Sequence, residues 1–177
     1  GPKGRMLANF RVFERAQRIY LQLPASNLEP VLKRLRMFVL RAKVELEDAS
    51  EQLVRIGLAG DCAPGLLAGR FPVVPEAPGA VSSQGEITLI RLPDAGSPRF
   101  ELIGPPADMQ ALWRELAAHA SPANADYWGL LDVRAGIPTV YPETAEAFVP
   151  QMANMQLVDG VSFTKGCYTG QEIVSRM

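Results

Sequence analysis

EITLIRLPDAGSPRFELIGPPADMQALWRELAAH, residues 86–119, is the stretch of sequence that best indicates how the chain folds. Two runs in it, Glu86 to Leu92 and Arg99 to Ile103, read as strands around a turn of Pro, Gly and Ser. Asp108 to His119 then predicts an amphipathic helix, because its apolar residues recur at helical spacing. Adjacent strands followed by a helix favour an α+β fold over a doubly wound parallel sheet.

The flanking sequence predicts further short elements of both kinds. We expect strands within 6–14 and at 19–23 and 52–58, and helices at 28–41, 61–68 and 126–135. The helix at 28–41 has the clearest start signal, since Ser26 and Glu29 have the spacing of a capping box. Residues 71–85 are rich in Pro and Gly and predict a loop or linker. We therefore expect two α+β modules, residues 1–85 and 86–177.

The composition is that of an ordinary globular chain. Its 177 residues are 47% hydrophobic and 21% charged, and the formal net charge of -1 argues against a generally nucleic-acid-binding surface. Two cysteines and one histidine are too few for a disulfide framework or a usual zinc site built by this chain alone. No apolar run of about 18 residues predicts a membrane span, and the start lacks the apolar core of a signal peptide. We expect a reduced, cytoplasmic setting without membrane contact.

Basic side chains decorate the predicted helix at 28–41. They are Lys33, Arg34, Arg36 and Arg41, followed by Lys43. Such charges most often form a solvated helix face. The alternative is a contact with RNA or another phosphate-bearing partner, and the sequence leaves both interpretations open.

A glycine-rich cysteine loop near the C-terminus is the candidate functional centre, Lys165-Gly166-Cys167-Tyr168-Thr169-Gly170-Gln171-Glu172. Glycine permits positive φ and close approach of the backbone to a ligand, and successive N–H groups in such a loop can bind an anion. The charge of Lys165 beside Cys167 favours the thiolate, which is the nucleophile and the metal ligand. Tyr168 can shield or orient the sulfur, and Gln171 and Glu172 add hydrogen-bonding groups.

Other interpretations of this loop remain open on the residues alone. A cysteine between glycines can simply be a small residue in a tight turn. The loop contains no CxxC pair for dithiol chemistry, and it lacks the full GxxxxGK[ST] pattern of a nucleotide-binding loop. No obvious His or Asp partner makes Cys167 a hydrolase nucleophile.

The cysteine octapeptide resembles the signature of the YgfZ-type folate-binding proteins, relatives of the aminomethyltransferase (T-protein) of glycine cleavage. Three upstream segments resemble the same family: Lys3-Gly4-Arg5-Met6-Leu7, Ala135-Gly136-Ile137-Pro138, and Phe148-Val149-Pro150-Gln151 followed by Asn154-Met155. The similarity runs through the whole chain, and the octapeptide is its most specific part.

The resemblance implies a GcvT-like fold, in which ferredoxin-like α+β modules surround a tetrahydrofolate pocket and a small β-barrel follows. Such proteins are usually longer, so we expect an internal fragment that lacks the opening strand and the C-terminal barrel. The implied role is that of a bacterial, folate-binding accessory factor for the assembly or repair of iron–sulfur clusters. Through it the protein would support tRNA-modifying radical enzymes, its iron–sulfur partners. A classical enzyme is not expected.

The resemblance also assigns roles to individual residues. Cys167 is implied to be the reactive thiol or a transient cluster ligand, and Lys165 to tune its charge. A resident metal is not expected. The residues expected to contact the folate are Gly166, Tyr168, Gly170 and Gln171 of the loop, and Trp128 and Arg134 upstream.

One segment departs from the pattern of the T-protein, which carries Arg-x-Glu before its Ala-Gly. The matching residues here are Asp132-Val133-Arg134, so a cation replaces the glutamate that helps to hold the pterin. Arg134 can stack on a ring or bind the glutamate tail of folate, but it cannot accept the same hydrogen bonds. Two alternatives remain: a tetrahydrofolate-dependent, aminomethyltransferase-like enzyme, and a noncatalytic RNA- or protein-binding module that uses the basic helix at 28–41.

Overall fold

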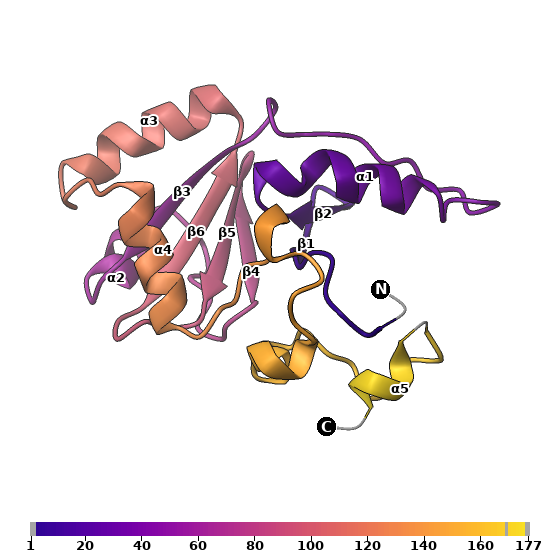
Figure 1. Ribbon diagram of the computed structural model, residues 1–177. Coiled ribbons are helices and arrows are strands. Elements are labelled where there is room, and N and C mark those ends of the chain that lie inside the picture. The colour runs from indigo at the N-terminus through magenta and orange to yellow at the C-terminus, as the bar shows by residue number, and fades with distance from the viewer. Residues whose placement is uncertain (1–2, 169, 176–177) are drawn as a thin grey trace. The chain divides into compact units, whose positions relative to one another are not determined.

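The computed structural model describes residues 3–168 and 170–175 (Figure 1). In this part of the chain, two antiparallel sheets and five α-helices alternate with short 3-10 helices. The predicted α+β class is therefore confirmed.

The chain divides into two compact units, each assembled from separate stretches of sequence. Unit 1 contains Gly1–Phe13, Gln17–Glu47 and Gly136–Met177, and unit 2 contains Glu14–Ala16 and Asp48–Ala135.

This division does not follow the boundary that we expected at residue 85. That position falls inside a hairpin, because β4 (Val81–Gln84) pairs directly with β5 (Ile87–Leu92). The Pro- and Gly-rich composition of 71–85 predicted only a loop, yet its last residues form this edge strand. The arrangement as ferredoxin-like modules stays a prediction.

Unit 2 is built on a four-stranded antiparallel sheet of order β3-β6-β5-β4. β3 is Val54–Ala59 and β6 is Arg99–Gly104, and every residue of β5 and β6 is buried. The hairpin predicted within 86–103 is confirmed, since β5 and β6 pair in register from Thr88 with Ile103 to Leu92 with Arg99.

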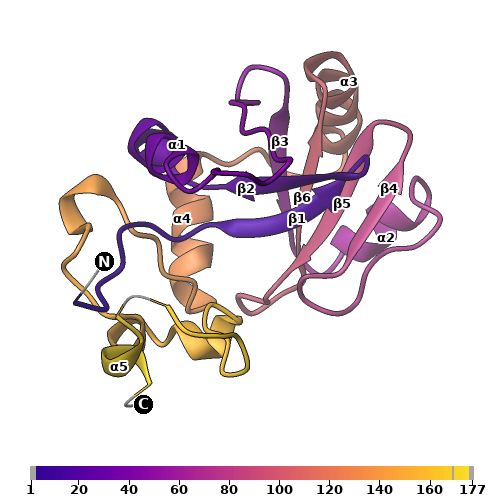
Figure 2. The same ribbon diagram turned by 90° about the vertical axis from the view of Figure 1, so that its right-hand side faces the viewer.

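Helices pack on both faces of this sheet. α2 (Ala63–Ala68) and α3 (Pro106–Ala117) pack on one face. α4 (Ala125–Arg134) lies on the other face, against Gly57 and Arg99, which alternate with core residues along their strands. Figure 2 shows α2 behind the strands and α4 beside β3. The core between the sheet and the first two helices contains Ile56, Leu58, Leu67, Phe71, Leu89, Phe100, Leu102, Met109, Leu112 and Leu116.

A hairpin of β1 (Arg11–Arg15) and β2 (Arg18–Gln22) opens the chain and confirms the two strands predicted there. The rings of Phe13 and Tyr20 stack with their centroids 5.5 Å apart. Both turn residues have positive φ, 49° at Ala16 and 62° at Gln17, although neither is glycine.

The helix predicted at 28–41 is shorter than expected: α1 spans Leu28–Arg36. The apolar stripe continues to Phe38 and Leu40, but these side chains are 67% and 85% exposed. A helix draws most of its stability from packing its apolar face, so the unpacked continuation does not extend it.

The expected capping box at the start of this helix is wrong. Ser26 lies in a 3-10 helix, η1 (Ala25–Asn27), and the N-cap residue of α1 is Asn27 without a side-chain cap. The Asn27 side chain is buried and donates instead to the carbonyl oxygen of Val140 at 2.5 Å. At the N-cap position, a hydrogen bond to the distant Val140 therefore takes the place of a local capping bond.

The last part of unit 1 consists mainly of short helical turns. They are η2 (Pro142–Thr144), η3 (Pro150–Ala153), η4 (Met155–Val158) and α5 (Gln171–Val174). The sequence did not predict the 3-10 turns, because elements of three or four residues are too short to show a periodicity.

Candidate functional site

The cysteine loop lies in unit 1 and leads into α5. Gly170 is the N-cap residue of this helix and has φ 90°, the left-handed conformation that glycine adopts without a Cβ penalty. Its carbonyl oxygen accepts hydrogen bonds from the N–H groups of Ile173 (3.2 Å) and Val174 (3.4 Å). Gly166 does not have positive φ, so only one of the two glycines uses that freedom. Thr169 lies outside the described residues.

Tyr168 links the two ends of the loop. The Nζ atom of Lys165 lies 4.1 Å from the centroid of the Tyr168 ring, which is a close cation–π contact. The backbone N–H of Tyr168 donates to Oε1 of Gln171 at 3.3 Å, and its carbonyl oxygen accepts from the N–H of Gln171 at 3.1 Å. The structure thus brings together three of the residues that the sequence singled out.

Cys167 is exposed between Lys165 and Tyr168. The backbone N–H of Lys165 donates to the hydroxyl of Ser162 at 3.2 Å, which ties the start of the loop to the preceding turn. A dissolved reagent or a partner can therefore reach the thiol, which carries a lysine two residues before it.

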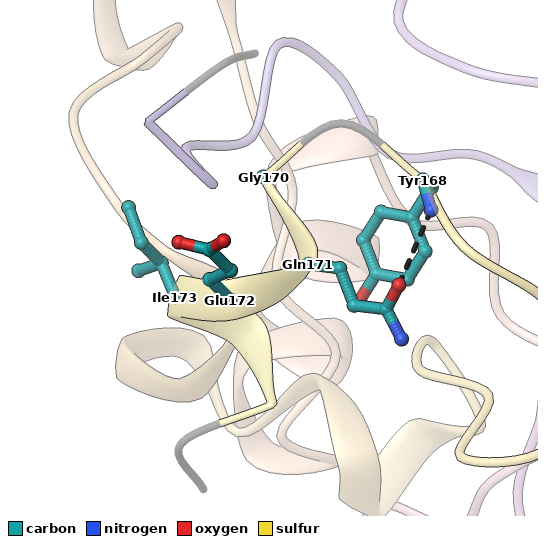
Figure 3. A pocket seen from close by; sticks show the side chains of 5 residues that line it. All are labelled: Tyr168, Gly170, Gln171, Glu172 and Ile173. Atoms are coloured by element: carbon teal, nitrogen blue, oxygen red, sulfur yellow. Dashed lines mark hydrogen bonds between the residues drawn. The ribbon is translucent and has the colours of Figure 1, made fainter.

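A small pocket lies beside α5. Its volume is about 280 Å³, and it is lined by Tyr168, Gly170, Gln171, Glu172 and Ile173. In Figure 3 the side chains of Tyr168 and Gln171 lie together, whereas those of Glu172 and Ile173 point away from them. Pockets for drug-sized molecules measure roughly 300–1,000 Å³, so this one is slightly smaller than the usual ligand pocket.

Two segments that resembled the YgfZ-type family also reach α5. A Cβ atom placed on Gly4 would lie 3.0 Å from the Cβ of Ile173 and 3.3 Å from the Gly170 carbonyl oxygen. The side-chain amide of Gln151 donates to the carbonyl oxygens of Ile173 (2.8 Å) and Val174 (3.1 Å). Segments more than a hundred residues apart in the sequence thus meet at the helix that follows the cysteine.

The other two predicted folate contacts, Trp128 and Arg134, belong to unit 2. The guanidinium carbon of Arg99 lies 5.2 Å from the centroid of the half-buried Trp128 ring, and a Cβ on Gly57 would collide with that ring. Arg134 is exposed in the last turn of α4, where a positive charge complements the helix dipole. Packing within unit 2 accounts for Trp128, and the folate contacts of both residues stay predictions.

Asp132, which we matched to the segment that holds the pterin in the T-protein, has an internal partner. Its carboxylate accepts a hydrogen bond of 3.0 Å from Arg99, a side chain that is fully buried. Nη2 of Arg99 is buried and has no partner among the described residues. The sequence offered no signal for this pair, since its members lie 33 positions apart.

The four basic residues of the predicted helix are all exposed: Lys33, Arg34 and Arg36 on α1, and Arg41 beyond its end. The guanidinium of Arg34 lies 5.8 Å from the centroid of the Phe38 ring. Met37, Phe38 and Leu40 are also exposed, so cations and apolar side chains share this surface.

Neither a metal cluster nor a membrane helix is found in the part of the chain that the structure describes. Residues 3–168 and 170–175 contain no group of three or more His, Cys, Asp or Glu side chains placed to hold a metal ion. No helix in the same ranges is both long and apolar enough to cross a membrane.

Comparison with known proteins identifies the class to which this fold and loop belong. No protein-family model matches the chain. It is 36% identical over 175 residues to a protein of Colwellia psychrerythraea. The matched region covers 99% of this chain and 53% of that protein. The chain is 36% identical over 174 residues to a protein of Yersinia enterocolitica and 34% identical over 174 residues to one of Serratia proteamaculans, with 98% of this chain and 52% of each relative covered.

All three relatives are named tRNA-modifying protein YgfZ. The similarity extends over nearly every residue of this chain, and the chain belongs to the YgfZ-type proteins. It spans about half the length of the curated relatives that it matches.

Proposed function

We propose that this chain acts in tRNA modification as a folate-binding accessory protein for cytoplasmic iron–sulfur enzymes, with Cys167 as its reactive thiol. The name of the relatives supports the link to tRNA modification. The family resemblance supplies the folate and the iron–sulfur partners. The observation that carries the proposal is the exposed Cys167 in a loop where the Lys165 ammonium lies 4.1 Å from the Tyr168 ring centroid.

The chemistry of a thiol in this setting fits a transient rather than a resident role. Iron–sulfur clusters are held mainly by several cysteine thiolates, whereas the cysteines of this chain are Cys62 in unit 2 and Cys167 in unit 1. Cys167 would therefore supply one ligand or one nucleophile to a cluster or sulfur species that a partner holds.

The role of the thiol is tested by complementation. In cells that lack their own YgfZ protein, the gene encoding this chain should restore the level of thiomethylated tRNA nucleosides, measured by mass spectrometry. Cys167→Ala should abolish most of the restoration. Cys62→Ala is the matched control, because Cys62 is also exposed but lies at the start of α2. Equal restoration by both variants would remove Cys167 from the mechanism.

The folate is tested by titration of the purified protein with tetrahydrofolate. We expect saturable binding, with the pocket beside α5 holding one part of the ligand. Tyr168→Leu should weaken binding, while Tyr141→Leu, which changes an exposed tyrosine elsewhere in unit 1, should not. Arg134→Ala tests the predicted contact in unit 2, and unchanged affinity in this variant would exclude Arg134 from the site.

The aminomethyltransferase alternative receives less support. A one-carbon transfer needs a carboxylate near the reactive folate nitrogen for acid–base help or charge stabilisation. In the segment that we matched to the T-protein, the carboxylate of Asp132 is paired with Arg99.

A direct RNA contact is favoured by one observation, the exposed cations on and after α1. Neutralised phosphate contacts make RNA affinity fall steeply with salt. Lys33→Ala with Arg41→Ala should lower tRNA affinity and flatten its salt dependence, whereas Arg114→Ala, an exposed cation on α3, should not. Binding that is absent or insensitive to salt would eliminate this second function.

A further inference from the structure

Gln151 occupies an unusual position relative to the cysteine loop. It belongs to η3 and lies 20 to 23 residues before the residues of α5 along the chain, yet its amide Nε2 donates to two carbonyl oxygens at the end of that helix. The last carbonyls of any helix lack partners within the helix. In a helix of four residues these unpaired groups are a large fraction of all hydrogen-bonding groups, so the cap supplied by Gln151 matters more than in a long helix.

The element that carries Gln151 is itself anchored. Just before η3, the carbonyl oxygen of Phe148 accepts from the N–H of Met6 at 2.9 Å, and the N–H of Glu146 donates to the carbonyl oxygen of Met6 at 2.7 Å. The guanidinium of Arg5 donates to the Glu146 carbonyl oxygen at 3.0 Å and to that of Ala147 at 2.5 Å. Gln151 therefore projects from a segment that is held in place.

The same N-terminal segment also contacts α5 directly. Gly4 has φ 67°, and a Cβ on it would lie 3.0 Å from Ile173, tighter than ordinary van der Waals contact. The carbonyl oxygen of Gly170 lies 3.3 Å from that same point. Gly4 thus lies against the first turn of α5, while Gln151 holds its last carbonyls.

The position of α5 determines that of the cysteine loop through Tyr168. Gln171 in the first turn exchanges hydrogen bonds with Tyr168, and the Tyr168 ring holds the Lys165 ammonium. We infer that Gln151 and Gly4 are positioning residues, which clamp α5 and thereby hold the Lys165–Tyr168 contact that flanks Cys167. This inference rests on the proposed role of Cys167 as a reactive thiol.

The test measures how strongly Lys165 acts on the thiol, in the 177-residue chain with Cys62→Ser so that one thiol remains. The measured quantity is the ratio of alkylation rates with anionic iodoacetate and neutral iodoacetamide, recorded across pH. We expect Gln151→Met to lower this ratio about threefold, since an attraction between unit charges in water is modest. Methionine is close to glutamine in length and adds no charge, but it has no donor for the two carbonyl oxygens.

A rescue variant separates positioning from general damage. Lys at position 151 retains a donor and places a positive charge at the helix C-terminus, where both are favourable. Gln151→Lys should therefore keep the rate ratio near that of the unchanged protein. A ratio that Gln151→Met leaves unchanged, or that both variants lower equally, would overturn the inference.

Gly4→Ala provides a second, independent variant. It should lower the rate ratio in the same direction as Gln151→Met, and Gly65→Ala in α2 is its control, because a Cβ there meets nothing within 4 Å. Amide NMR shifts of Gly170, Gln171 and Ile173 should move in both clamp variants, while those of β5 and β6 report that unit 2 remains folded.

These readouts do not depend on the biological assay. Full tRNA modification by Cys167→Ala would refute the function proposed for the thiol. The rate ratios and amide shifts of the Gln151 variants would still decide whether the clamp exists.

Discussion

Unit 2 and unit 1 maintain their conformations by different means. Unit 2 has a four-stranded sheet whose central strands are buried along their whole length, with a packed core beneath α2 and α3. In the described part of unit 1 the regular sheet is limited to the β1–β2 pair, and the end of β1 at Glu14 and Arg15 is assigned to unit 2. Its distant segments are joined by single side chains, such as Asn9 to Pro138 at 2.7 Å, Asn27 to Val140 and Gln151 to α5.

This difference separates stability from positioning. Truncating a buried leucine typically costs about 2–5 kcal/mol, whereas one hydrogen bond contributes about 0.5–1.5 kcal/mol net. We therefore expect variants in unit 2 to change the free energy of unfolding most. Variants of the linking side chains in unit 1 should change the geometry of the cysteine loop more than they change stability.

The largest effect is expected at the ion pair between Arg99 and Asp132 in unit 2. Asp132→Asn removes the charge that faces Arg99, a side chain with no exposed surface, although the Asp132 side chain itself is 26% exposed. We expect a cost of about 2–3 kcal/mol, below that of a fully buried pair, because the Arg99 charge stays buried without compensation. Urea unfolding measures this loss. Asp126→Asn, on the exposed first turn of the same helix, is the control and should cost less than about 1 kcal/mol.

The next effect concerns the contact between α4 and the sheet. Gly57→Ala places a Cβ 2.5 Å from the Trp128 ring, and overpacking of this kind costs about 1–3 kcal/mol. A double-mutant cycle with Trp128→Ala checks the cause, since the alanine at position 57 should cost much less once the ring is absent. An equal cost in both backgrounds would place the damage in the strand itself.

The sequence also predicts the structure of unit 2 more accurately than that of unit 1. The β5–β6 hairpin and α3 were predicted within about two residues, because their signals are local: apolar periodicity and turn residues. The same rules overextended α1, since the apolar stripe at Phe38 and Leu40 lacks a surface to pack against.

The candidate site shows more clearly which contacts the sequence cannot predict. The octapeptide located the loop, and the contact of Lys165 with Tyr168 joins residues three positions apart. The clamp on α5 could not be predicted, because Gly4 and Ile173 are far apart in the sequence and no spacing rule connects them. The segments that contain Gly4 and Gln151 were noticed only through the family resemblance, which gave no geometry.

The two hairpin turns predict smaller changes in the free energy of unfolding, and one of the two variants should stabilise the protein. The β1–β2 turn places Ala16 and Gln17 at positive φ, while the β4–β5 turn uses Gly85 at φ 57°. Asn-Gly is the preferred pair for such a turn, so Ala16→Asn with Gln17→Gly should stabilise the protein by about 1 kcal/mol. Gly85→Ala should destabilise it by a similar amount. Thermal unfolding of both variants checks the signs, and destabilisation by the first variant would contradict the prediction.

The smallest effect is expected at the exposed ion pair of unit 1. Arg18 and Glu47 approach to 2.6 Å, but their side chains are 67% and 52% exposed. Water and salt screen such a pair, and exposed pairs contribute about 0.2–1 kcal/mol. Glu47→Gln should therefore reduce the free energy of unfolding by less than about 0.5 kcal/mol, and 1 M salt should remove that difference. A loss as large as that of Asp132→Asn would mean that ion pairs stabilise both units equally, which the difference in burial argues against.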